Sequence, residues 1–145
     1  WVENGVLKTL SYSRFWATEQ GVAPRAAPSN LVVSGGDATV EDMIASIKRG
    51  VLITRFWYIR PLNPRTVAYT GLTRDGTFLI ENGRISRPVT NFRFNQSLMD
   101  LLANVDMVGR AARVAALESG STGMAVVTPA LKVRDFVLSS VSDAI

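Results

Sequence analysis

Side chains that could act as nucleophiles, bases or metal ligands are scarce in this chain. Its 145 residues include no His and no Cys. Thiolate or imidazole zinc centres, and nucleophile pairs that depend on Cys or His, are therefore excluded from this chain alone. Serines are plentiful, but Lys8, Lys48 and Lys132 are the only lysine bases, and none follows a serine at Ser-x-x-Lys spacing. We expect no catalytic and no metal-ligating residue here.

Two carboxylates come close enough in sequence to be considered as a general acid–base pair. Asp75 lies in the triplet Arg74-Asp75-Gly76, and Glu81 begins the triplet Glu81-Asn82-Gly83. Both triplets are typical of turns, where acidic residues are common. The turn interpretation is therefore preferred to a catalytic one.

Arg55 is the residue most suggestive of a binding role. It interrupts the otherwise apolar segment 51–59, and a charge in such a strand is seldom buried without a partner. Two interpretations stay open. Arg55 could clamp a carboxylate of a peptide substrate, or it could form a structural pair with Asp75 or Glu81.

A second, weaker candidate pair lies further along the chain. Asn91 and Arg93 alternate within an extended segment, so they are expected on the same side of a strand. A solvated strand face would explain them equally well. The candidate substrate-binding residues are therefore Arg55, Asp75, Asn91 and Arg93.

The basic residues are unevenly distributed. The chain has 16 Lys and Arg against 12 Asp and Glu, and between Arg49 and Arg93 there are eight Arg and only two acids. Such a stretch can attract nucleic acid or an acidic peptide. Because it contains no run of basic residues and no basic helix, solvated strand faces are the preferred explanation, and nucleic acid is not the expected partner.

Length and composition fit one globular domain covering residues 1–145. The longest apolar stretch, 51–59, is far shorter than the roughly 20 residues that a membrane span requires, so we expect no membrane partner. The lack of Cys favours a cytoplasmic protein. Since the chain starts at Trp1 and not at Met, we expect it to be a fragment of a longer protein.

The local patterns predict short helices at chain positions that carry capping signals. The first predicted helix covers 13–20 and is closed by Gly21, the second begins at Thr39 and has a stop signal at 48–50, and the third covers 97–104. Segment 105–116 is assigned a possible further helical turn.

The remaining patterns predict strands and turns. A hairpin is expected around the turn 3–5 and a β-meander around the turns 74–76 and 81–83. Loops are expected at 22–30 and 118–123. The predicted strands are 6–12, 31–34, 51–60 (ended by Pro61 and Pro64), 66–72, 77–80, 84–90, 91–96, 124–127 and 130–138. The expected fold is α+β, mainly antiparallel β-sheet arranged as a sandwich or curled barrel, with two or three short helices.

Four long segments carry a resemblance to a known family. Residues 54–60, 63–66, 70–83 and 88–97, flanked by 28–31 and 129–136, closely resemble the C-terminal domain of the TldD/PmbA family, also called modulator of DNA gyrase. The resemblance covers nearly the whole chain. It identifies the chain as the C-terminal domain of a longer TldD/PmbA-type protein.

The resemblance implies a function that the residues alone do not. TldD-type members are zinc metallopeptidases that process unfolded peptides or small proteins and pair with a subunit of the same fold. In these members, the metal-binding helix with two His and a Glu lies upstream of the region present here. In the best-known type, a Cys from the C-terminal domain is the third zinc ligand. No ligand can be carried over here, so zinc is expected only in the parent, through upstream residues, unless the parent is the non-catalytic subunit.

Three roles therefore compete. The leading one is a domain that is not catalytic alone and supplies part of the peptide-binding cleft and of a homo- or heterodimer interface. An extended peptide could add as a strand to segment 52–60 or to the meander edges. The alternatives are a module that interacts with DNA or gyrase, supported only by the arginine-rich centre, and a purely structural dimerisation domain.

Overall fold

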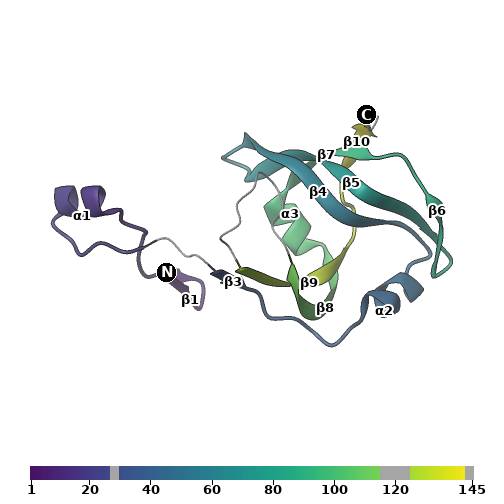
Figure 1. The fold of residues 1–145 in the computed structure, drawn as a ribbon, viewed down its shortest axis with the longest axis horizontal. Helices are drawn as coiled ribbons and strands as arrows, with labels where there is room; N and C mark the ends of the chain where they lie inside the picture. The colour runs from purple at the N-terminus through teal and green to yellow at the C-terminus, as the bar shows by residue number, and fades with distance from the viewer. Residues whose placement is uncertain (27–29, 115–124, 143–145) are drawn as a thin grey trace.

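The polypeptide forms an N-terminal arm followed by a sheet-rich body (Figure 1). The computed structural model describes residues 1–26, 30–114 and 125–142. The arm, residues 1–26, contains β1 (Val2–Glu3), β2 (Val6–Leu7) and α1 (Arg14–Gln20). Figure 1 shows the arm projecting away from the body.

The body contains two sheets and two further helices. Its elements are β3 (Asn30–Val32), α2 (Val40–Ala45), β4 (Arg49–Asn63), β5 (Ala68–Glu81), β6 (Arg84–Pro88), β7 (Phe92–Ser97), α3 (Leu98–Ala103), β8 (Val105–Val114), β9 (Ala125–Val133) and β10 (Leu138–Val141).

The larger sheet is antiparallel throughout. Its strands run in the order β10-β7-β5-β4, and β6 also pairs with β5. In the smaller sheet, β3 pairs with β9 in parallel and β9 pairs with β8 antiparallel. The described residues contain no closed barrel. The predicted α+β class, mainly antiparallel with three short helices, is confirmed.

One face of the larger sheet forms the core. Phe94 is buried, and its ring centroid lies 5.1 Å from that of Phe56 and 5.5 Å from that of Phe136. Gly71 sits directly beneath: a Cβ added there would lie 2.6 Å from the Phe94 ring. Because Gly71 has no side chain, the three aromatic rings can pack close to this face of the sheet.

The capping signals correctly predicted where helices begin. Ser13, Thr39 and Ser97 each accept a hydrogen bond from a backbone N–H of the first turn, and Asp42 completes a capping box with Thr39. Gly21 closes α1 in the left-handed conformation, as expected. The predicted end of the second helix is wrong, because α2 ends at Ala45 and Arg49 already belongs to β4.

Three predictions about strands are also wrong. The triplet Arg74-Asp75-Gly76 is a β-bulge inside β5 and not a turn, since pairing with β4 continues on both sides of it. Strand β4 runs through Pro61 to Asn63, which an edge strand permits because proline removes no ladder bond on its open side. Residues 105–114, assigned a helical turn, form strand β8.

The bounds of other predicted elements differ from those in the structure without changing the fold. The turn at Asn4-Gly5 is confirmed, with both residues at positive φ, but its return strand covers only Val6–Leu7. Strand β9 joins two segments that had been separated at 128–129. The predicted loop 118–123 lies outside the described residues.

The chain exposes far more surface than a compact monomer of its mass. Its accessible surface is 10515 Å² for 15.8 kDa, whereas a compact folded monomer would expose about 7,300 Å². Large apolar side chains of the arm are among the exposed ones, where Phe15 is 73% and Trp16 51% exposed. None of the helices in the described part of the chain has the length and apolar character needed to cross a membrane.

Candidate functional site: a bulged edge strand and an arginine face

Strand β4 forms an edge of the larger sheet. It pairs with β5 along its whole length, and no described strand pairs with its other side. Its 15 residues make it the longest strand described. A strand edge offers backbone donors and acceptors to another extended chain. The segment predicted as a peptide acceptor therefore lies where such a peptide could add.

The pairing of β4 with β5 shifts register at three places, between Ile53 and Arg55, between Trp57 and Arg60, and between Pro61 and Asn63, and the first two are the bulges nearest to Arg55. At the first, Asp75 and Gly76 of β5 lie opposite the single residue Thr54, whose hydroxyl donates to the Gly76 carbonyl at 2.9 Å. At the second, Tyr58 and Ile59 of β4 lie opposite Gly71. Asp75 and Tyr58 both have positive φ, 59° and 54°. Bulges re-aim the side chains next to them and are frequent beside functional sites.

Arg55 is paired with Asp75. Its Nη1 contacts Asp75 Oδ2, and the Arg55 guanidinium stacks 4.7 Å from the centroid of the Trp57 ring. The Arg55 side chain is 33% exposed and that of Asp75 is 56% exposed. Of the two structural partners considered, Asp75 is therefore the one in contact, while Glu81 lies across from Arg49 at the other end of the pairing. The bulge is what brings the Asp75 carboxylate to this position.

Asn91 belongs to a buried polar cluster. The Thr77 hydroxyl lies 2.9 Å from Thr73 Oγ1 and 3.0 Å from Asn91 Oδ1, and the Phe92 N–H donates to Thr73 Oγ1 at 2.9 Å. Thr73 and Thr77 are both buried. Asn91 therefore satisfies hydroxyl groups inside the sheet.

Arg93 points elsewhere. It lies opposite Leu72, and its Nη1 donates to Thr70 Oγ1 at 3.4 Å. The structure thus does not bring Asn91 and Arg93 together, because Asn91 precedes β7 and contacts different threonines. Arg93 is grouped instead with Arg55.

Register places four arginines on the sheet face opposite the aromatic core. Arg55 pairs with Arg74, Trp57 pairs with Leu72, Leu72 pairs with Arg93, and Arg60 pairs with Thr70. Paired residues share a face, as do residues two apart in one strand. We call this surface the arginine face, defined by Arg55, Arg60, Arg74 and Arg93 around Trp57 and Leu72.

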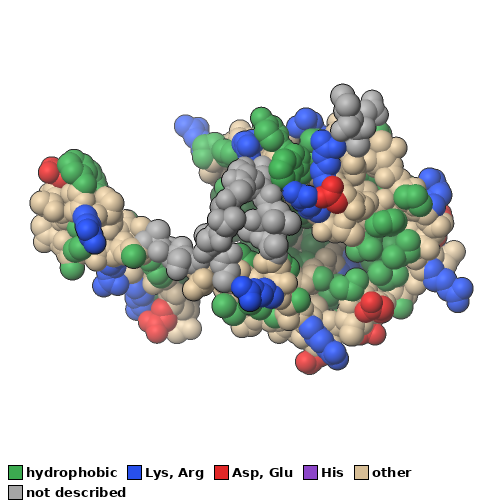
Figure 2. Space-filling view, in the orientation of Figure 1, with side chains coloured by type: hydrophobic (Ala, Val, Ile, Leu, Met, Phe, Trp, Pro, Cys, Tyr) green, Lys and Arg blue, Asp and Glu red, His purple; other side chains and the backbone are tan. Residues whose placement is uncertain are grey.

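Figure 2 shows basic side chains gathered over the region where β4, β5 and β7 lie in Figure 1. Arg60 stacks on Tyr58 at 4.2 Å from the ring centroid. Sequence reasoning missed Arg60 and Arg74 as members of the site. The signal that could have found them is register, which depends on the two bulges.

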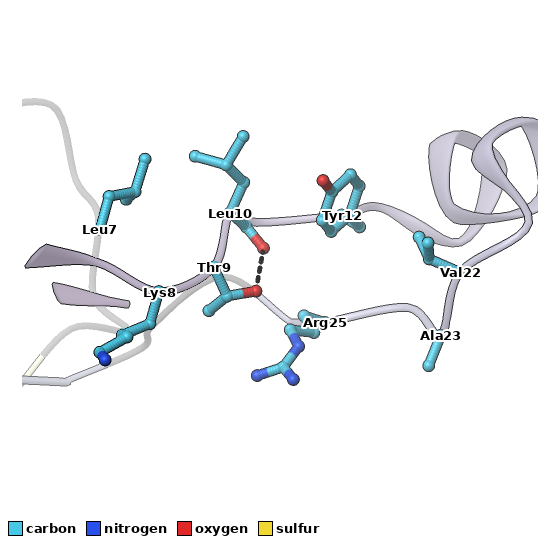
Figure 3. Close-up of a pocket in the computed structure, with 8 residues that line it drawn as sticks. All are labelled: Leu7, Lys8, Thr9, Leu10, Tyr12, Val22, Ala23 and Arg25. Carbon is cyan, nitrogen blue, oxygen red and sulfur yellow. Dashed lines mark hydrogen bonds between the residues drawn. The ribbon is translucent and has the colours of Figure 1, made fainter. Parts of the chain in front are cut away.

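A separate open cavity of about 450 Å³ lies in the arm (Figure 3). It sits between segments 7–12 and 22–25, which are joined by backbone hydrogen bonds between Tyr12 and Arg25. Leu7, Leu10 and Val22 line it, together with Lys8 and Arg25.

The described residues do not fit a zinc centre. No three His, Cys, Asp or Glu side chains gather in residues 1–26, 30–114 and 125–142. The Asp42 carboxyl is the one group of the described chain whose pKa is clearly displaced; hydrogen bonds from the backbone N–H and side chain of Thr39 lower it. That group caps α2 and lies outside the arginine face. No chemical step through a metal is derived from this chain.

Comparison with known protein families and with a curated protein identifies one family. Residues 1–140 match the family described as PmbA/TldA metallopeptidase C-terminal domain. A protein of Methanothermobacter thermautotrophicus named metalloprotease is 30% identical over 142 residues, covering 86% of this chain and 30% of that protein.

Solved structures show the same fold. TldE from Thermococcus kodakarensis superposes with a TM-score of 0.68 at 20% identity, covering 91% of this chain and 31% of TldE. A protein of Thermotoga maritima described as a candidate modulator of a DNA gyrase gives 0.65 at 25% identity, covering 91% of this chain and 30% of the other. The chain thus spans about a third of the length of these relatives.

Proposed function

Because the chain belongs to the PmbA/TldA metallopeptidase C-terminal domain family, we propose that it forms one wall of a peptide-binding cleft in a longer protein. The wall is strand β4, which accepts an unfolded peptide or small protein as an added strand. The domain is not catalytic by itself. Any zinc and its ligands belong to the rest of the parent protein, which we place in the cytoplasm.

The observation that carries this proposal is that β4 lies at the border of its sheet, with no strand of the described residues paired to its outer side. A strand 15 residues long at the border of a five-stranded sheet offers main-chain hydrogen bonds to a second chain. Such bonds give affinity with little dependence on side-chain sequence. The bulge at Tyr58 and Ile59 divides the edge of β4. Between Arg49 and Trp57 the strand itself carries no extra residue, because the bulge opposite Thr54 adds its residue to β5, so this segment is the part proposed for pairing.

The arm supports a second role, contact with a subunit of the same fold. Trp1, Leu7, Leu10, Phe15 and Trp16 are each about half or more exposed. We assign the arm to the interface of a homo- or heterodimer.

An interaction with DNA or gyrase is the alternative function. Its support is the arginine face and the name of the Thermotoga maritima relative. Nucleic-acid binding would fall steeply with salt because phosphate contacts release counterions. Pairing of a neutral peptide with a strand edge has no such dependence.

Backbone methylation of a bound peptide tests strand addition directly. In a strand, only alternate N–H groups point toward the partner strand. We expect a neutral β-forming peptide to bind the chain, and N-methylation of one alternate set of residues to abolish binding. Methylation of the other set should leave binding nearly intact. Equal effects of the two sets would contradict strand addition.

A further inference from the structure

We propose that the arm makes its subunit contact by reciprocal exchange, in which helix α1 of one copy docks on helix α3 and the β4–β5 hairpin of a second copy. This inference rests on the proposed role of the arm in subunit contact and names the surface that receives it. It is carried by an exposed apolar face on each element and by one carboxylate and one guanidinium that would meet between them.

Helix α1 presents two aromatic side chains with a carboxylate between them. Phe15, Trp16 and Glu19 are all exposed. Glu19 lies four residues after Phe15 and three after Trp16, so it is a neighbour of both on the helix surface. The other side of α1 carries Ala17, which is buried. We call Phe15, Trp16 and Glu19 the α1 face.

Helix α3 exposes an apolar face of matching character. Met99 and Leu102 are each 63% exposed, Leu98 is also exposed, and no residue of this helix is buried. Leu102 lies three residues after Met99 and four after Leu98, so the three side chains share one side of the helix. A helix with such a stripe normally turns it toward a core. Here the stripe is open, and an apolar partner would cover it.

The β4–β5 hairpin lies against the start of α3. The Leu98 N–H donates to the Val67 carbonyl at 3.1 Å, and the Ser97 hydroxyl donates to the Thr66 carbonyl at 3.1 Å. Val67 is exposed and has a φ of 49°, which is rare for a β-branched residue. These hydrogen bonds hold it in that conformation next to Leu98. We call Val67, Leu98, Met99 and Leu102 the receiving face.

The charges beside the two faces are complementary. Arg65 is exposed and lies two residues before Val67 in the hairpin. No ion pair joins Glu19 or Arg65 to another residue in the described ranges. A guanidinium pairs with a carboxylate and also stacks on aromatic rings. Arg65 therefore suits the α1 face, which offers it Glu19 and Trp16 together.

The occupant that fits is a second copy of this chain. Figure 1 shows α1 near one end of the long axis of the molecule, away from the α3 helix of its own chain. Each copy carries both an α1 face and a receiving face. Two copies can therefore exchange arms about a two-fold axis, so that the same contact forms twice and the dimer closes.

Charge reversal combined with mixing tests the exchange on the 145-residue chain. Glu19→Lys and Arg65→Glu should each raise the dissociation constant of self-association about tenfold, because each places like charges opposite each other in both contacts. An equimolar mixture of the two variants should associate about as tightly as the unaltered chain. In the mixed dimer each altered side chain meets the opposite charge. Sedimentation equilibrium over a concentration series measures all three.

Two further variants locate the contact. Leu102→Ser should weaken self-association several-fold, because Leu102 is the most central residue of the α3 stripe. Arg113→Glu reverses the same charge as Arg65→Glu at an exposed position of β8 in the other sheet. It should leave self-association unchanged.

The contrary outcomes are separable. Weakening by both charge reversals without recovery in the mixture overturns the pairing of Glu19 with Arg65 across the dimer. Association that depends on Phe15 but not on Leu102 or Arg65 overturns the receiving face and leaves the arm as an interface. A chain that stays monomeric over the whole series overturns the exchange, and strand addition at β4 is unaffected by that result.

Discussion

Arg55 on β4 lies directly across from Arg74 on β5, yet its guanidinium turns to the Asp75 carboxylate and to the ring of Trp57. This orientation of the Arg55 guanidinium is possible because the bulge adds one residue to β5 at this point. A charge pair that would be unfavourable in a regular ladder is thereby retained.

The ion pair between Asp75 and Arg55 is predicted to contribute little to the stability of the chain, because both side chains are partly exposed. We expect Asp75→Asn to keep the bulge, because Asn also tolerates positive φ, and to change the free energy of unfolding by less than about 1 kcal/mol, as for an exposed ion pair. Chemical denaturation measures this free energy, and a loss well above about 1 kcal/mol would show that the ion pair holds the bulge in place.

Asn91 is predicted to stabilise the sheet and not to bind peptide. Asn91→Ala removes a carbonyl that lies 3.0 Å from the Thr77 hydroxyl and 3.3 Å from the Thr73 hydroxyl. One of these two buried hydroxyls then loses its acceptor, and an unsatisfied buried hydroxyl costs about 1–3 kcal/mol. Asn95→Ala, at an exposed position of β7, should cost less than about 0.5 kcal/mol. Urea unfolding compares the two variants. A loss of peptide affinity in Asn91→Ala, with stability unchanged, would reverse this assignment.

Gly71 is predicted to be essential for aromatic packing. In Gly71→Ala the new Cβ would meet the Phe94 ring at 2.6 Å and the Trp57 carbonyl at 3.2 Å. Overpacking of this kind costs about 1–3 kcal/mol. Adding Phe94→Leu should recover part of that loss, so the double-mutant cycle should show favourable coupling. Additive losses in thermal or urea unfolding would mean that the ring is not the obstacle.

Local signals predicted local structure well in this protein. Ser13, Thr39 and Ser97 accept hydrogen bonds from backbone N–H groups within four residues. The start of each of these helices can therefore be predicted from sequence alone. Arg74-Asp75-Gly76 was misread because the same residues serve a turn or a bulge. The choice depends on whether the partner strand continues, and that is decided by residues more than 15 positions away.

The candidate site was predictable only in part for the same reason. Arg55 stood out because it interrupts an apolar run, and its pairing with Asp75 was one of the alternatives. Arg60 and Arg74 carried no local signal, since exposed arginines in strands are common. Their convergence with Arg93 comes from the register of three strands, which a single sequence does not specify.

The cap of α2 should make stability sensitive to acid. Hydrogen bonds from Thr39 lower the pKa of the Asp42 carboxyl below its ordinary value of 3.8. The stabilisation is therefore complete above the unfolded-state pKa and is lost as pH falls through the lower folded-state pKa. Hydrogen exchange of α2 amides should show this loss, and Asp42→Asn should remove the pH dependence. An unchanged acid response in Asp42→Asn would assign it to other carboxylates.

The arm should mediate association without stabilising the isolated chain. Phe15 is 73% exposed, so Phe15→Ser should change the free energy of unfolding by less than about 0.5 kcal/mol. It should weaken self-association, or association with a same-fold subunit, in sedimentation experiments across a concentration series. Val32→Ser changes an equally exposed residue of β3, 74% exposed, and serves as the control. Equal effects of both variants would argue against an interface specific to the arm.

Hydrogen exchange of β4 with and without a bound peptide tests the central claim most directly. Strand addition requires that amides of β4 facing away from β5 become protected when a neutral β-forming peptide binds. Alternate residues between Arg49 and Trp57 should therefore slow markedly, while β8 and the arm keep their rates. Protection confined to the arm cavity, or none in β4 at peptide saturation, would contradict the assignment of β4 as the wall of a peptide cleft.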